Sequence, residues 1–190
     1  QLTYLAHQPK WPMLQMLVCM LLHASAHAVC NSTFKHVSHG STLVTCRLFN
    51  IKNTFSCVGL EHVLLTCLPN VETSKELFMG KNGIFEYANS NQVLVDHSTV
   101  DVKTSKKCFD SASTKGLNFL DAPISGGPGG AADGTLTIMV GGKESSFNYA
   151  NEAFEMMGSK ISYMGPSGAG TAMKLVNQLL VSTNTVAAAE

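Results

Sequence analysis

One segment near the end of the sequence carries an amine and two amides at helical spacing, namely Lys174, Asn177 and Gln178. In a helix, residues three and four positions apart lie on the same face, so these side chains would face one cavity. An amine there can exchange the proton of a substrate hydroxyl and stabilise negative charge that develops on its oxygen. The simpler alternative is a solvated lysine, which is the ordinary state of this side chain.

The stretch DAPISGGPGGAADGTLTIMVGG, from Asp121 to Gly142, contains seven of the 16 glycines of the chain. It could be a phosphate-binding loop, a flexible linker or a loop that binds another ligand. Neither the P-loop motif nor the G-x-G-x-x-G fingerprint occurs in it, and strand-like flanks argue against a linker. Backbone N–H groups in a glycine turn suit a carboxylate, because no side chain obstructs its approach. The turn that contains Ser125, Gly126 and Gly127 could therefore bind a ligand through its backbone, although Ser125 could be an ordinary turn residue.

Strands and helices alternate along the chain from residue 61 onward. Apolar runs bounded by turn residues indicate strands within 62–69, 92–99, 117–123, 134–142 and 160–165. Helices are expected within 71–79, 101–116, 143–158 and 167–190, the third of them closed by its last glycine. Such alternation predicts an α/β fold with a doubly wound parallel sheet, whose ligands bind beyond the carboxyl ends of the strands. The stretches LPN, DHST and DAPISGG would all lie at that edge.

Charge and composition argue against two classes of partner. The chain has 190 residues, with 13 basic and 13 acidic side chains, and 45% of its residues are hydrophobic. This is apolar enough for a packed core but not basic enough for nucleic-acid binding. A neutral chain also offers no electrostatic attraction to an anionic membrane surface. We therefore expect neither nucleic acid nor a membrane as partner.

The first sixty residues differ from the rest. They contain no Asp or Glu, the first being Glu61, and they hold four of the six cysteines. The apolar segment Pro12–Ala28 resembles a secretory signal, but the chain begins with glutamine and the apolar core of the segment is short. An organelle transit peptide should contain more arginine, and the cluster of Cys19, His23, His27 and Cys30 lacks a second ligand set for metal. We expect residues 1–60 to be unrelated in sequence to the domain that follows them.

Several separated motifs together resemble the 3-hydroxyisobutyrate dehydrogenase family of β-hydroxyacid dehydrogenases. These are LLTCLPN, VDHST, LDAPISGGPGGAADGTLTIMVGG and GPSGAGTAMKLVNQ, in the order of the family. The resemblance implies a Rossmann-like fold, NAD or NADP as cofactor, and hydride transfer between nicotinamide and a small 3-hydroxy acid or its semialdehyde. It also implies Lys174 as proton donor and acceptor. The Ser125–Gly127 loop, Asn177 and Gln178 would bind the substrate.

The same resemblance implies cofactor contacts at the ends of two strands. Leu68, Pro69 and Asn70 follow the first strand, and Ser98 and Thr99 follow the second. Simpler alternatives exist for both groups. A proline can merely end a strand, and a serine or threonine before a helix can merely cap it.

The sequence departs from the family pattern at both ends. Family members open with a strand and a G-x-G-x-M-G turn that holds the pyrophosphate, whereas residues 1–15 contain no glycine. We expect an atypical segment over 1–60 and, over 61–166, a partial NAD(P)-binding domain that is incomplete at its N-terminal βαβ unit. The start of the interdomain helix would occupy 167–190. In the family, the helical domain that follows this helix makes the oligomer.

The sequence leaves two alternatives to an oxidoreductase that acts on a small-molecule carboxylate substrate. One is an inactive, truncated fragment of the family, and the other is a relative that binds without catalysis. For location, we expect the cytoplasm or an organelle, with the mitochondrion included, and we do not expect secretion.

Overall fold

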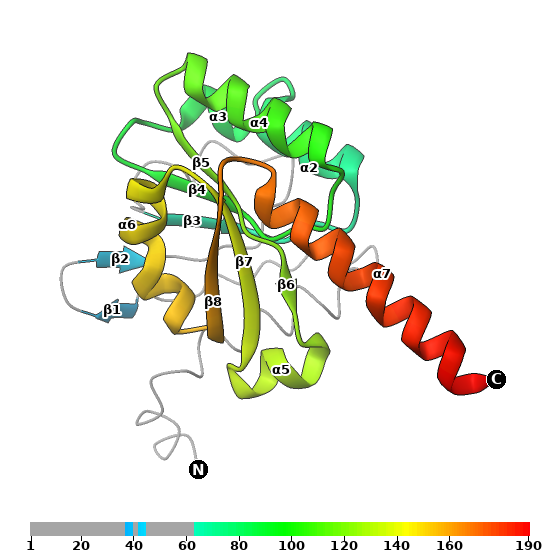
Figure 1. Ribbon diagram of the computed structural model, residues 1–190. Helices are drawn as coiled ribbons and strands as arrows, with labels where there is room; N and C mark the ends of the chain where they lie inside the picture. The colour runs from blue at the N-terminus through cyan, green and yellow to red at the C-terminus, as the bar shows by residue number, and fades with distance from the viewer. Residues whose placement is uncertain (1–36, 40–41, 45–62) are drawn as a thin grey trace, which may run out of the picture.

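The computed structural model describes residues 37–39, 42–44 and 63–190, which form one sheet flanked by helices (Figure 1). The strands are β1 (Val37–His39), β2 (Thr42–Val44), β3 (Val63–Thr66), β4 (Val93–Asp96), β5 (Asn118–Asp121), β6 (Ile124–Ser125), β7 (Leu136–Gly142) and β8 (Gly158–Gly165). The helices are α2 (Val71–Met79), α3 (Ile84–Tyr87), α4 (Val102–Thr114), α5 (Gly127–Asp133), α6 (Glu144–Glu155) and α7 (Ala169–Ala189).

The sheet is mixed, with a parallel centre. Its order is β1-β2-β3-β4-β5-β7-β6, with β8 paired to β7. Strands β2, β3, β4 and β5 run parallel, which confirms the expected Rossmann-like α/β fold. Strand β7 runs antiparallel to β5 and β6. The sequence led us to expect a parallel sheet, whereas the sheet is parallel only from β2 to β5 and between β7 and β8. The connection from β6 to β7 contains only the seven-residue helix α5. A strand parallel to β6 would need a longer crossover connection.

The glycine-rich stretch has more secondary structure than its composition indicates. It forms β6, then helix α5, then a left-handed turn at Gly134 with φ of 63°, which leads into β7. Helix α6 ends at Glu155 rather than at Gly158. Gly158 instead begins β8, where a Cβ atom would lie 2.5 Å from the Leu136 carbonyl oxygen. Close strand pairing therefore explains this glycine better than helix termination does.

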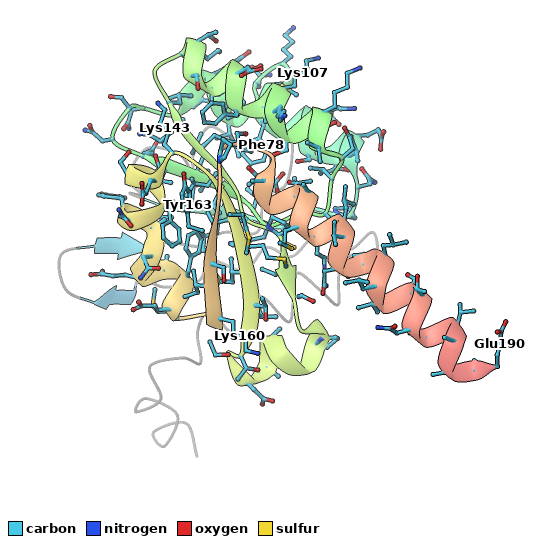
Figure 2. The ribbon with its side chains drawn as sticks, in the orientation of Figure 1. Phe78, Lys107, Lys143, Lys160, Tyr163 and Glu190 are labelled. Carbon is cyan, nitrogen blue, oxygen red and sulfur yellow. The ribbon has the colours of Figure 1, made fainter. Side chains whose placement is uncertain are left out.

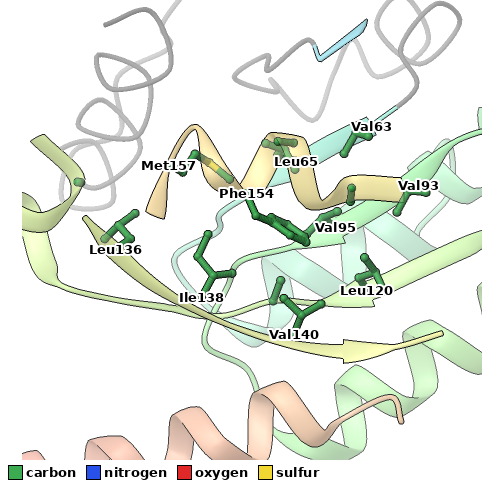
Figure 3. Packing of buried hydrophobic residues seen from close by; sticks show 14 residues of the cluster. Val63, Leu65, Val93, Val95, Leu120, Leu136, Ile138, Val140, Phe154 and Met157 are labelled. Carbon is green, nitrogen blue, oxygen red and sulfur yellow. The ribbon is translucent and has the colours of Figure 1, made fainter. Parts of the chain in front are cut away.

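Two apolar clusters hold the helices on opposite faces of the sheet. Alternate residues of a strand point to opposite faces. On one face, Leu65, Val95 and Ile138 pack against Phe154 of α6 (Figure 3). On the other face, Leu64, Leu94 and Phe119 pack against helices α2 to α4. The strands are therefore buried on both sides, as the unbroken apolar runs predicted.

The helices bury apolar side chains against the sheet and expose charged side chains on their outer faces. Phe78 of α2 is fully buried beneath its helix and makes an edge-on contact with Phe119, with ring centroids 5.2 Å apart. Lys107 lies on the outer face of α4 and points away from the sheet (Figure 2). Both helices begin at polar caps, because Asn70 accepts a hydrogen bond from the Thr73 N–H and Asp101 accepts one from the Thr104 N–H, each at 2.8 Å.

Helix α7 begins against the sheet and then leaves it (Figure 1). At its start, a Cβ atom at Gly170 would lie 2.3 Å from the Met139 carbonyl oxygen, so only glycine allows this approach. Further along, apolar side chains are exposed, including Leu179 at 66% and Val176 at 52%. In the described part of the chain, none of the helices combines the length and apolarity needed to cross a membrane.

We expect Gly170→Ala to destabilise the fold by about 2 to 3 kcal/mol, because a methyl group there must push α7 away from β7. The matched control is Gly129→Ala in α5, where a Cβ atom would meet nothing within 4 Å. Alanine favours helix over glycine, so the control should be neutral or stabilising. Urea unfolding measures both variants, and equal effects would contradict the close approach of α7.

Candidate functional site

A cavity of about 460 Å³ lies where strands β3 and β4 end, facing the β6–α5 junction and α7. Eight of the eleven site residues expected from the sequence line it: Leu68, Pro69, Thr99, Ser125, Gly126, Gly127, Lys174 and Gln178. Five further residues complete the wall: Cys67, His97, Ile124, Leu136 and Val181. Segments more than 100 residues apart in sequence thus meet at one site.

Lys174 is the cationic side chain of this cavity wall. It is only 7% exposed, and no described residue forms a hydrogen bond or an ion pair with its Nζ atom. Burial lowers the pKa of Lys174, because the charged ammonium loses hydration. The amine can therefore lose and regain its proton closer to neutral pH than a solvated lysine can.

The Ser125–Gly127 loop and the helix face that carries Lys174 are directly connected. Asn177 donates a hydrogen bond from Nδ2 to Ser125 Oγ at 3.2 Å, although Asn177 itself is not part of the cavity wall. Gly126 and Gly127 have φ values of 137° and 61°, a backbone conformation that favours glycine. A Cβ atom at Gly127 would meet nothing within 4 Å, so open space adjoins this backbone. The loop is shaped by backbone conformation and anchored through one side chain.

Ser98 and Asn70 have structural roles outside the cavity wall. Ser98 is buried, accepts a hydrogen bond from the Leu68 N–H at 2.8 Å, and donates one to Asp96. Asn70 caps α2 through the Thr73 N–H. Ser98 therefore orients the backbone of Leu68, a residue that lines the cavity.

Asp96 ties together the ends of β3 and β4. Its buried carboxylate accepts hydrogen bonds from Thr66 Oγ1 at 3.2 Å, Ser74 Oγ at 2.5 Å, and the backbone N–H and hydroxyl of Ser98. A buried carboxylate needs such donors, because burial removes its hydration. The network sets the two strand ends relative to each other and to α2.

Our sequence reasoning missed Cys67 and His97, although both lie within the quoted motifs LLTCLPN and VDHST. Each is the first residue after its strand, at the edge where ligands of such sheets bind. This position at the carboxyl end of a strand was the signal in the sequence that could have identified both residues. Burial and the nearby Asp96 raise the pKa of Cys67 to about 11, so its thiol is neutral at physiological pH.

Asp121 fixes the start of α7. Its buried carboxylate accepts hydrogen bonds from the Gly168 N–H at 2.8 Å, the Thr171 N–H at 2.8 Å and Thr171 Oγ1 at 3.0 Å. Burial raises its pKa, while these three donors act in the opposite direction. Asp121 ends β5 shortly before the Ser125–Gly127 loop, and Lys174 lies about one turn after Thr171. One side chain therefore positions both halves of the site.

We expect Asp121→Asn to destabilise the chain by about 1 to 3 kcal/mol, because an amide replaces one of the accepting oxygens with a donor. Asp110→Asn, on the exposed side of α4, is the matched control and should have little effect. Thermal and urea unfolding measure the difference. Equal stability of the two variants would show that the Asp121 hydrogen bonds do not hold α7.

Lys174→Met is expected to raise the free energy of unfolding near neutral pH. The pKa of Lys174 is lowered in the folded chain, so its contribution to stability is complete above the ordinary pKa of 10.5 and is lost as pH falls through the folded-state pKa. Methionine avoids this loss. The stability gained by the variant should therefore be larger at about pH 7 than above pH 10.5.

Lys103→Met, at an exposed position of α4, should leave stability nearly unchanged at either pH. Urea titrations of wild type and both variants test this expectation. A gain for Lys174→Met that is independent of pH would contradict a desolvated amine.

Comparisons with known sequences found related proteins. Residues 16–165 match the family model described as the NAD binding domain of 6-phosphogluconate dehydrogenase, so the match begins within the first sixty residues. An uncharacterised oxidoreductase of Synechocystis sp. is 42% identical over 128 residues, which are 67% of this chain and 44% of that protein. Mouse mitochondrial 3-hydroxyisobutyrate dehydrogenase is 39% identical over 127 residues, which are 67% of this chain and 38% of that protein.

Solved structures agree with these matches. A 3-hydroxyisobutyrate dehydrogenase of Mycobacterium tuberculosis, solved with L-serine, superposes with a TM-score of 0.65 at 33% identity, over 70% of this chain and 44% of that one. Another, from Salmonella typhimurium, has a TM-score of 0.66 at 25% identity, over 72% of this chain and 47% of that one.

The chain spans 38–44% of the length of the two curated relatives named above. The matched part contains the sheet and the strand ends that form the cavity, together with the glycine-rich stretch. The chain belongs to the 3-hydroxyisobutyrate dehydrogenase, or β-hydroxyacid dehydrogenase, family of oxidoreductases and carries their NAD-binding domain of the 6-phosphogluconate dehydrogenase type.

Proposed function

We propose that this chain serves an NAD(P)-dependent oxidoreductase that interconverts a small 3-hydroxy acid and its semialdehyde. One observation carries the proposal. A single cavity of about 460 Å³ joins the strand ends of an NAD-binding domain, a glycine loop suited to a carboxylate, and a buried amine. A cavity of this size lies in the range of small-ligand sites, about 300 to 1,000 Å³.

The residues of the cavity fit a nicotinamide cofactor on the side of β3 and β4. Leu68 and Pro69 present backbone there, Thr99 presents a hydroxyl, and Ser98 and Asp96 hold the Leu68 backbone in place. When bound, the cofactor would supply or accept the hydride. Whether it is NAD or NADP is tested below by titrating both forms.

The substrate would bind on the opposite side, between the loop and α7. Ser125, Gly126 and Gly127 would hold its carboxylate, with Asn177 fixing the Ser125 hydroxyl through their hydrogen bond. Gln178 lines the same wall and can hydrogen-bond a substrate oxygen. The limited volume restricts the substrate to a small acid once a nicotinamide ring shares the cavity.

Lys174 would move the proton of the reaction. In oxidation, its neutral amine takes the hydroxyl proton as the hydride leaves the adjacent carbon. In reduction, the ammonium returns that proton to the carbonyl oxygen. Burial lowers the pKa of Lys174 and so favours the neutral amine more than in a solvated lysine, and the cation can stabilise charge on the oxygen.

We also propose a location and a mode of assembly for the protein. The mouse relative is named as mitochondrial, which supports our proposal of an organellar or cytoplasmic location. Exposed apolar residues of α7, among them Leu179 and Leu180, support the proposal that further protein packs on this helix and contributes to an oligomer.

We expect the purified chain to bind NADH or NADPH saturably and to reduce a small carboxylate semialdehyde. Lys174→Ala should lower kcat by about 10² to 10⁴-fold while changing the nucleotide Kd by less than about threefold, because Lys174 transfers the proton and does not bind the nucleotide. Nucleotide fluorescence and absorbance measure binding and turnover.

Lys103→Ala, at an exposed position of α4, is the matched control and should retain full turnover. Failure of wild type to bind either nucleotide would contradict this function for the chain. Binding without turnover, unaffected by Lys174→Ala, would favour a relative that binds without catalysis.

A further inference from the structure

Helix α5 begins at Gly127, the last residue of the Ser125–Gly127 loop, and buries little of its surface. It lies at one end of β6 and β7, apart from the other helices (Figure 1). Its one buried residue is Ala131, which is 2% exposed and joins the apolar cluster on that face of the sheet. Its first turn has no side-chain cap from any described residue. A short helix anchored by a single methyl group gains little stability from packing.

The sequence of α5 also forms a helix poorly. Three of its first four residues are glycines, namely Gly127, Gly129 and Gly130. A glycine inside a helix lowers the helix-forming equilibrium about fivefold relative to alanine. Helices of this length are marginal in water even with good helix formers, because nucleation fixes several residues for one hydrogen bond. The order of α5 therefore depends on what surrounds it.

Packing does not require glycine at two of these positions. A Cβ atom at Gly129 would meet nothing within 4 Å, and one at Gly130 would meet other atoms no closer than 3.5 Å. Neither residue has a positive φ. At Gly158 and Gly170, by contrast, neighbouring carbonyl oxygens leave no space for a methyl group. Alanine would fit at Gly129 and favour the helix, so glycine there lowers the stability of α5 without improving its packing.

Both ends of α5 have the backbone conformation of a hinge. Gly126 and Gly127 at its start have φ values of 137° and 61°, and Gly134 after its end has 63°. Glycine absorbs large changes of φ and ψ with little steric cost. The cavity wall includes Gly126 and Gly127 before the body of the helix and Leu136 after it. Opening of α5 would therefore change the shape of the loop in the cavity wall.

We propose that α5 and the Ser125–Gly127 loop form one unit, which opens locally in the free chain and closes when a small carboxylate binds to the loop. The inference rests on the proposed function, in which the loop holds the substrate carboxylate, and adds the element that sets the affinity. Part of the binding free energy orders α5, so the apparent Kd of the acid exceeds that of a preformed site. Opening of the same unit releases the product.

Amide hydrogen exchange tests the coupling in the wild-type chain. In the free chain, residues 129–135 should exchange faster than β7, because α5 opens without global unfolding. The probe is 3-hydroxypropionate with NADH, a pair that cannot transfer a hydride because both are reduced. At about ten times its Kd, the acid should slow exchange of residues 129–135 about tenfold relative to NADH alone, because it binds the closed form.

Variants outside the cavity wall test whether the order of α5 sets the affinity. Gly129→Ala should lower the Kd of 3-hydroxypropionate by about two- to fivefold and slow exchange in α5, with the NADH Kd unchanged. Ala132→Gly, at an exposed position of the same helix, should change both in the opposite direction. Glu152→Gly, at an exposed position of α6, is the matched control. It weakens a helix elsewhere and should leave the Kd of the acid unchanged.

Several results would overturn the inference. Exchange of α5 as slow as that of β7 in the free chain shows that the unit does not open. Weaker binding of the acid by Gly129→Ala shows that a ligand or another segment approaches Gly129 closely, and equal Kd values for Gly129→Ala and Ala132→Gly show no coupling.

The same measurements separate this inference from the proposed function. If the acid binds with NADH while exchange in α5 does not respond, the inference fails and the oxidoreductase proposal stands. If wild type binds neither the nucleotide nor the acid, both fail.

Discussion

The contact between the start of α7 and the carboxyl end of β5 is the constraint on which the site depends. Asp121 accepts three hydrogen bonds from Gly168 and Thr171, and a Cβ atom at Gly141 would lie 2.7 Å from one of its carboxylate oxygens. The helix can approach this closely only because glycines line the contact. Since the loop at Ser125 follows β5 and Lys174 follows Thr171, the distance between loop and amine is set here.

The two halves of the cavity are built on different principles. On the side of β3 and β4, the Asp96 network fixes two neighbouring strand ends, and Ser98 holds the Leu68 backbone. On the side of β6 and α7, positive φ values shape the Ser125–Gly127 loop, and a hydrogen bond from Asn177 to Ser125 connects it to α7. Buried polar groups hold the first half, whereas Gly126 and Gly127 in the second half are exposed.

Two buried polar groups of this cavity lack partners among the residues that the structure describes. These are the amine of Lys174 and the Nε2 atom of His97. Each arrangement costs free energy in the isolated chain, because buried polar groups lose hydration. For the amine of Lys174, such a cost is expected where a ligand, rather than the protein, completes the hydrogen bonds.

Among the described residues, local sequence was sufficient to identify five of the eight strands and four of the six helices. The apolar runs at β3 and β4 predicted buried strands, and the spacing of Lys174 and Asn177 predicted one helix face, because both signals depend on neighbouring residues only. Only the tertiary structure decided the antiparallel direction of β7, the role of Ser98 behind Leu68, and the unpaired nitrogen of His97. These features depend on contacts between residues 25 to 30 positions apart or on strand pairing, which no local pattern encodes.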